Sequence, residues 1–164
     1  MSKHLTTRTV DEQHLELALF MYRRAKHLAP SEKALKYLGA LGQISVNRMA
    51  ENYCAYIENT TVCSETNQKG YDLDNRTEVK TGATLSSLQF HGKNCRTNYF
   101  TLNGLKNKES SHHILAIIYN DVLSKTQVIK IPNSFYRNRT KYSCGVNKKT
   151  GDINGLQKYI IDEG

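Results

Sequence analysis

The stretch HHILAIIYND, residues 112 to 121, has six successive apolar residues at its centre. A short apolar run of this kind predicts a strand buried in a sheet. Four other runs after Asn59 also have strand character and are bounded by turn residues. These runs are KGYDLD (69–74), TEVKT (77–81), NYFTLN (98–103) and TQVIKI (126–131), which closes at Pro132.

The first third of the chain has a helical pattern instead. Residues 11 to 28 are rich in helix formers, start at the N-cap candidate Asp11 and stop before Pro30. A short helix is expected from Ser31 to about Leu38. Residues 45 to 59 carry one apolar stripe at helical spacing, formed by Val46, Met49, Ala50, Tyr53, Cys54 and Ile57. Helices followed by strands predict an α/β (α+β) fold, a central mixed sheet of about five strands flanked by helices.

The length of 164 residues suits one domain with one core. We expect residues 1–58 to form a helical N-terminal part, 69–131 the sheet core and 133–164 a basic tail. In that tail we predict a turn at residues 149–152 and a final helix near 156–161.

The chain starts without an apolar signal core and has no run of membrane-spanning length, so a cytoplasmic protein without a membrane partner is expected. The four cysteines are far apart and include no C-x-x-C pair. They are therefore expected to be reduced thiols rather than metal ligands.

Positive charge is confined to one half of the sequence. Residues 1–79 contain as many acidic as basic residues, whereas residues 80–164 contain thirteen Lys or Arg and five Asp or Glu, which is the whole net charge of +8. A one-sided basic field attracts polyanions, and nucleic acid is the common case.

The stretch KGYDLDNRTEVKTG, residues 69 to 82, places four charged groups within nine positions of strand-like sequence. They are Asp72, Asp74, Glu78 and Lys80. Alternate residues of a strand share a face, so an antiparallel hairpin with a three-residue turn at 75–77 would gather all four on one face. A two-residue turn would separate them, and the alternative is a polar hairpin facing water.

A cluster of carboxylates is best relieved by a hard divalent cation such as Mg²⁺, for which Mn²⁺ can substitute. Such an ion acidifies bound water and stabilises charge on a phosphate, while Lys80 beside it could position the water or neutralise the transition state. This chemistry is phosphodiester hydrolysis.

G-Y-D-L followed shortly by E-V-K-T resembles the PD-(D/E)XK nuclease superfamily, which includes most type II restriction endonucleases. The resemblance covers roughly residues 42–131, and it implies a restriction-endonuclease-like mixed sheet flanked by helices. It also implies that Asp72 and Glu78 are metal ligands, that the backbone carbonyl of Val79 completes the ligand set, and that Lys80 is the catalytic lysine.

The sequence departs from the family pattern at two points. Tyr71 stands where the family has proline, and the interval from Asp72 to Glu78 is short. Asp74 therefore competes with Asp72 for the ligand role, and we favour Asp72 because it lies in the G-x-D-L frame. Glu51 is a further candidate that would act through a water, or else a solvated surface residue.

Basic residues in the second half are the candidates for DNA binding, since Lys and Arg neutralise phosphates and Arg can read guanine. The candidates are Lys93, Arg96, Arg137, Arg139, Lys141, Lys148 and Lys149. His112 and His113 are expected to be packing or edge residues.

Together these features predict a Mg²⁺-dependent, sequence-specific double-stranded DNA endonuclease without an organic cofactor. Cutting both strands needs two sites, so a homodimer is expected. The alternatives are a structure-selective or homing nuclease of the same fold, and a non-catalytic DNA-binding protein with residues 42–57 as a helix-turn-helix.

Overall fold

The computed structural model describes residues 10–28, 46–63, 71–83, 85–86, 98–102, 105, 111–147 and 149–164. The helix expected at 31–38 lies outside these ranges. The elements are α1 (Val10–Leu28), α3 (Val46–Ile57), β1 (Thr77–Ala83), β2 (Leu85–Ser86), β3 (Asn98–Leu102), β4 (His113–Asn120), β5 (Lys125–Pro132), α4 (Asn133–Tyr136), β6 (Tyr142–Gly145), the 3-10 helix η2 (Gln157–Tyr159) and β7 (Ile160–Glu163).

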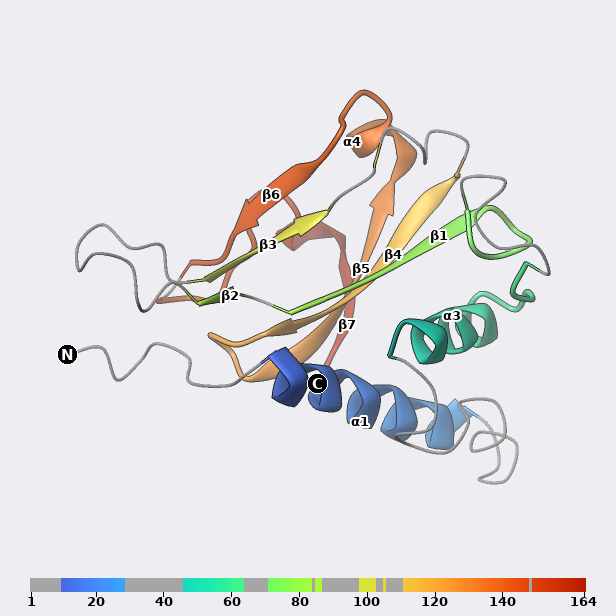
Figure 1. The fold of residues 1–164 in the computed structure, drawn as a ribbon, viewed down its shortest axis with the longest axis horizontal. Coiled ribbons are helices and arrows are strands. Elements are labelled where there is room, and N and C mark those ends of the chain that lie inside the picture. The colour runs from blue at the N-terminus through green and yellow to red at the C-terminus, as the bar shows by residue number, and fades with distance from the viewer. Residues whose placement is uncertain are drawn as a thin grey trace.

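A four-stranded sheet forms the centre of the fold, in the order β1-β4-β5-β7 (Figure 1). Strand β1 pairs parallel with β4, while β4 with β5 and β5 with β7 are antiparallel. The α/β class with a mixed sheet is therefore confirmed. Strand β4 is buried from its second residue onward. It has a neighbouring strand on each side, and each of its faces packs in an apolar cluster.

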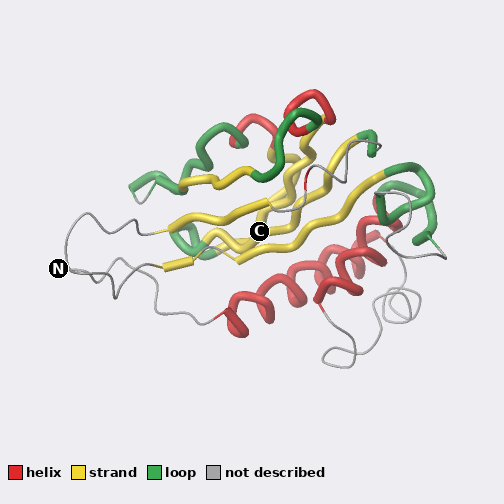
Figure 2. The backbone as a smooth tube through the Cα atoms, turned by 45° about the horizontal axis from the view of Figure 1, so that its top comes forward, coloured by secondary structure: helices red, strands yellow, loops and turns green. Residues whose placement is uncertain are grey.

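Helices α1 and α3 cover one face of this sheet, below the strands in Figure 2. Both helices were predicted, and the apolar stripe of α3 is the face that packs inward, with Met49, Ala50, Tyr53 and Cys54 buried. These side chains meet every second residue of β4, from Leu115 to Tyr119, as strand alternation requires.

The opposite face of the sheet is covered by a second layer of chain. A three-stranded sheet in the order β2-β3-β6, together with α4 and the segment before η2, lies over it. Ile114, Ala116 and Ile118 of β4 pack here against Tyr136 of α4 and Leu156. The two faces of β4 thus belong to two separate apolar clusters.

Three expectations for the strands are wrong. The run 98–103 forms β3 in the second sheet and not a strand of the central one. The run 69–74 contributes no strand among its described residues: Leu73 makes only an isolated bridge to Val62, and β1 pairs parallel with β4 instead of forming a hairpin. In the parallel pairing, every residue of β1 is opposite a residue of the apolar strand β4.

The end of the chain is also corrected. Residues 157–159 form a 3-10 turn and 160–163 form β7, where a helix was predicted. The free edge of β5 offers unpaired backbone groups, and β7 satisfies them. The predicted turn at 149–152 is confirmed, with Gly151 in the left-handed conformation. No helix among the described residues is long and apolar enough to cross a membrane.

Candidate active site

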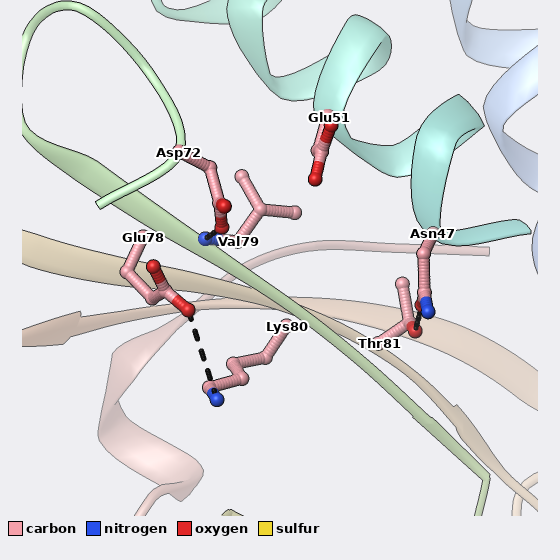
Figure 3. A pocket seen from close by; sticks show the side chains of 7 residues that line it. All are labelled: Asn47, Glu51, Asp72, Glu78, Val79, Lys80 and Thr81. Carbon is pink, nitrogen blue, oxygen red and sulfur yellow. Dashed lines mark hydrogen bonds and ion pairs between the residues drawn. The ribbon is translucent and has the colours of Figure 1, made fainter. Parts of the chain in front are cut away.

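A polar pocket of about 320 Å³ lies at the outer edge of β1. Its walls come from three places, namely the first turns of α3, the turn that precedes β1, and β1 itself (Figure 3). The residues that line it are Asn47, Glu51, Asp72, Glu78, Val79, Lys80 and Thr81. Three carboxylates and one ammonium group therefore line one cavity, which gives it an excess of negative charge.

Strand alternation in β1 sets the orientation of three of these residues. Val79 packs into the apolar cluster under the helices, so Glu78 and Lys80 point to the other side of the strand, as Figure 3 shows. Glu78 is only 3% exposed, and its carboxylate lies 3.7 Å from the ammonium of Lys80. A charge this deeply buried is tolerated when an opposite charge stands beside it.

Asp72 is brought to the same edge by a tight turn. The backbone N–H groups of Asp72 and Leu73 both donate to the carbonyl of Thr77, and the N–H of Arg76 donates to the carbonyl of Leu73. The Asp72 carboxylate then accepts a hydrogen bond of 2.9 Å from the backbone N–H of Val79. This bond ties the first predicted ligand to the strand that carries the second.

The same bond shows where the backbone of Val79 points. In a strand, the N–H and C=O of one residue point to the same side. Because the N–H of Val79 faces Asp72 at the open edge, its carbonyl also faces the pocket and not β4. The main-chain oxygen named from the sequence is thus directed to the open edge of β1, where the pocket lies.

Asp74 is directed elsewhere. It lies at the tip of the turn between Leu73 and Arg76, and its carboxylate accepts a hydrogen bond from the hydroxyl of Thr61. The expected convergence of Asp74 with the other carboxylates is therefore wrong, because that expectation needed a regular hairpin. Of the two competing aspartates, the pocket includes Asp72.

Glu51 does line the pocket, from the second turn of α3. Its side chain is 20% exposed and pairs with Arg48 at 3.2 Å. Burial raises the pKa of Glu51, and the negative charge of Asp72 raises it further, although Arg48 opposes both effects. Glu51 is therefore half-buried at the wall of the pocket and not fully solvated. Glu51 is off the apolar stripe, yet α3 packs on the edge strand and so presents this flank to the pocket.

Asn47 and Thr81 were not singled out from the sequence. The Asn47 carboxamide accepts a hydrogen bond from the Thr81 hydroxyl, which closes the far end of the pocket. A signal for Asn47 was available, because it precedes Glu51 by four residues and so lies on the same flank of the helix.

A second polar cluster supports the turn from behind and was also missed. The Glu58 carboxylate, just after α3, accepts hydrogen bonds from Asn75 and Thr77. It also lies 2.8 Å from a ring nitrogen of His113 and 3.7 Å from the ammonium of Lys130. The cluster joins α3, the Asp72 turn, β4 and β5. Its residues are far apart in the chain, so no local sequence pattern predicts it.

The pKa values in this second cluster are both lowered. Burial lowers the pKa of His113, against the attraction of Glu58, so the imidazole is neutral at pH 7. For Glu58, burial alone would raise the pKa, but the charges of His113 and Lys130 and the hydrogen bond from Asn75 lower it. His113 adds to that effect only in acid, where the imidazole is charged.

The residues of the pocket fit a hydrated divalent cation. Among the described residues, no three Asp, Glu, His or Cys side chains are close enough to form a preassembled metal centre. Mg²⁺ does not need one, since it keeps several waters and is commonly bound through one or two carboxylates. Asp72, Glu78 and the Val79 carbonyl supply such a set, and a cavity of about 320 Å³ leaves space for waters.

All of the DNA-binding candidates within the described ranges are exposed, and they lie before and after β6 of the second layer. Arg137, Arg139 and Lys141 follow α4, and Lys149 lies in the turn after β6. Lys93, Arg96 and Lys148 lie outside the described residues. The structure thus leaves four of the seven candidates accessible to a large ligand.

No model of a protein family matches this chain, and a search among curated proteins also finds no match. The resemblance in G-Y-D-L and E-V-K-T therefore rests on those residues alone.

Proposed function

We propose that the chain is a Mg²⁺-dependent, sequence-specific endonuclease that hydrolyses phosphodiester bonds of double-stranded DNA, in the manner of type II restriction enzymes of the PD-(D/E)XK superfamily. One observation carries the proposal: Asp72, Glu78, the backbone of Val79 and Lys80 line a single pocket at the edge of β1. These are the four groups that the resemblance assigns to metal binding and catalysis.

Each group has a defined task. Asp72, Glu78 and the carbonyl of Val79 would hold the cation, with Glu51 reaching it through a water. When bound, the ion supplies an acidified water and stabilises negative charge on the scissile phosphate. Lys80 is held 3.7 Å from Glu78, so its ammonium lies at the same edge and can orient the water or neutralise charge on the phosphate.

The electrostatics of the pocket favour a cation over a purely structural role. Carboxylates close together raise the free energy of the folded state, and the pKa of Glu51 is raised first by its burial and further by the negative charge of Asp72. Functional sites are where such unfavourable arrangements are kept. A divalent ion would relieve the repulsion and draw a phosphate into a pocket that is otherwise negative.

The partner would be duplex DNA, held by the basic second half of the chain. Each subunit would contribute the pocket at β1, so a homodimer would cut the two strands of a site. The same pocket in a structure-selective or homing nuclease would differ in the DNA that it accepts, and a non-catalytic DNA-binding protein would not need the pocket at all.

Incubation of the purified chain with plasmid and phage DNA, in Mg²⁺ and in EDTA, tests the proposal. We expect discrete fragments in Mg²⁺ or Mn²⁺ and none in EDTA, and sequencing of the ends gives the recognition site. A Lys80→Ala variant should bind DNA but not cut it. Lys125→Ala is the matched control, because Lys125 lies in the same sheet but pairs with Glu163.

The outcomes separate the rivals. Cleavage only at branched or looped substrates would favour the structure-selective nuclease. Cleavage at a single long site would favour the homing enzyme. DNA binding without cutting by the parent in any divalent metal would reject catalysis and leave the DNA-binding alternative.

A further inference from the structure

A cationic and aromatic surface lies at the junction of α4, β6 and η2, and we call it the α4–β6 surface. Residues 133–142 contain three cations and no acidic residue. Lys158 adds a fourth cation from η2. All four cations are exposed, and three half-buried aromatic rings lie among them. The cations are Arg137, Arg139, Lys141 and Lys158, and the rings are Phe135, Tyr142 and Tyr159.

Arg139 is the cation of this surface that lies over two aromatic rings. Its guanidinium lies 4.6 Å from the ring centre of Phe135 and 5.0 Å from that of Tyr142. Its Nε donates a hydrogen bond of 2.8 Å to the carbonyl of Phe135. The ring centres of Phe135 and Tyr142 lie 4.9 Å apart in an edge-to-face contact, so the two rings that hold the guanidinium also support each other.

This arrangement leaves the outer edge of the guanidinium available. Nε is used by the backbone, and the two terminal nitrogens point away from that bond because the group is planar. A planar pair of donors matches the O6 and N7 acceptors of guanine in the major groove. The side chains of Arg137 and Lys141, by contrast, make no hydrogen bond or ring contact with other described residues, as suits contacts to phosphates.

The α4–β6 surface adjoins the pocket. Register in the central sheet aligns Glu78 with Ile114 and Ile114 with Ile131, and α4 begins two residues after Ile131. Asn133 then donates to the carbonyl of Ser111, which holds α4 against the start of β4. Glu78 and α4 also lie on the same side of the sheet, since Tyr136 packs in the apolar cluster opposite the helices.

Electrostatics agree with this proximity. Burial raises the pKa of Tyr136, and the charge of Glu78 is among the causes that raise it further. A polyanion with one phosphate at the pocket would therefore continue over the α4–β6 surface on the same side of the sheet.

We infer that the α4–β6 surface is the docking face for duplex DNA and that Arg139 reads a guanine there, while Arg137 and Lys141 hold phosphates. The inference rests on DNA as the substrate of the proposed function. It assigns specificity to one arginine, because only a side chain already held in place can discriminate base edges without a large entropic cost.

A selection experiment in EDTA tests this inference without cleavage. The full chain is mixed with a pool of randomised duplexes, and the bound fraction is sequenced for the parent, Arg139→Lys and Arg137→Lys. The two variants make the same chemical change at residues with different proposed roles. Each keeps a positive charge and loses the planar pair of donors. Circular dichroism of each variant verifies folding.

We expect the parent to enrich a motif that contains a guanine. Arg139→Lys should lose about 10- to 100-fold of the preference at that position, as removal of a bidentate contact does, while total binding falls little. Arg137→Lys should keep the motif. The same motif in parent and Arg139→Lys would overturn the inference, as would a parent that enriches none.

Failure of the inference and failure of the proposed function are distinguishable. Selective binding in EDTA without cleavage in Mg²⁺ would support the docking face and reject the nuclease. Cleavage in Mg²⁺ at sites that Arg139→Lys leaves unchanged would support the nuclease and reject the role of Arg139. An Arg139→Ala variant repeats the comparison without the charge and should lose both motif and affinity.

Discussion

The edge of β1 and the α4–β6 surface differ in charge and in how their side chains are held. The pocket is negative, and its groups are fixed by hydrogen bonds and ion pairs to one another and to the backbone. The α4–β6 surface is positive, and only Arg139 among its cations following α4 is held by described neighbours. Acidic side chains in a pocket suit a small cation, whereas exposed cations on a surface suit a long polyanion.

The contrast suggests a division of labour. The pocket would carry out the chemical step, and the α4–β6 surface would supply affinity and specificity. Changes in the first region should then alter cleavage and leave binding intact, and changes in the second should do the reverse.

The largest expected effect is in the pocket. Asp72→Asn keeps the acceptor for the Val79 N–H but removes a charge, so the cleavage rate in Mg²⁺ should fall about 10²- to 10³-fold, as loss of one electrostatic group in an active site does. Asp74→Asn is the matched control and should change the rate little. Single-turnover cleavage measures both. Equal losses in the two variants would contradict the choice of Asp72.

The next effect concerns the α4–β6 surface. Replacing Arg137 and Lys141 by Gln should reduce the slope of log affinity against log salt by about 1.8, because each phosphate contact contributes about 0.9. The rate at saturating DNA should not change. Fluorescence anisotropy at several salt concentrations measures the slope. Arg23→Gln with Lys125→Gln, on α1 and β5, is the control pair, and a similar loss there would show a merely diffuse charge effect.

A third experiment uses the repulsion in the pocket. Mg²⁺ at about 100 times its dissociation constant should stabilise the parent by about 2.7 kcal/mol, seen as a higher melting temperature. Glu51→Gln should make the metal-free protein slightly more stable, because it removes a carboxylate whose pKa is raised by burial and by Asp72. It should also reduce the gain from Mg²⁺. A metal-free variant that is less stable than the parent would argue against crowding.

The smallest effect concerns the cluster behind the Asp72 turn. The pKa of His113 lies below its ordinary value of 6.5 and that of Glu58 below 4.5, so the unfolded chain binds protons first on acidification. Stability from His113 should therefore be present above pH 6.5 and be lost as pH falls, and stability from Glu58 should be lost at lower pH.

Replacement of His113 by Asn tests this sign. Between pH 7 and 5 the free energy of unfolding of the variant should fall less steeply than that of the parent, by at most about 1.4 kcal/mol per pH unit for one group. Urea unfolding at each pH measures the slope, and His112→Asn is the neighbouring control. A steeper fall in the His113 variant would contradict a neutral imidazole in the fold.

Several features of the fold were predictable because they depend on residues close in sequence. The stripe of α3 follows from a period of 3.6, and the apolar run of β4 from six consecutive residues. The shared side of Glu78 and Lys80 follows from strand alternation alone, whatever strand β1 pairs with. The candidate site was found for the same reason, since its central residues lie within nine positions.

Other features were decided only by tertiary structure. The sequence by itself determined that β1 would present a glutamate and a lysine together, but the tertiary structure paired β1 with β4 and left the outer edge of β1 to the Asp72 side chain instead of a hairpin strand. The Asp74 carboxylate accepts a hydrogen bond from Thr61 and does not line the pocket. The packing of α3 on β1 places Glu51 in the wall of the pocket. Each of these outcomes depends on a contact between segments far apart in the chain, and local periodicity carries no information about which distant backbone satisfies an open hydrogen bond.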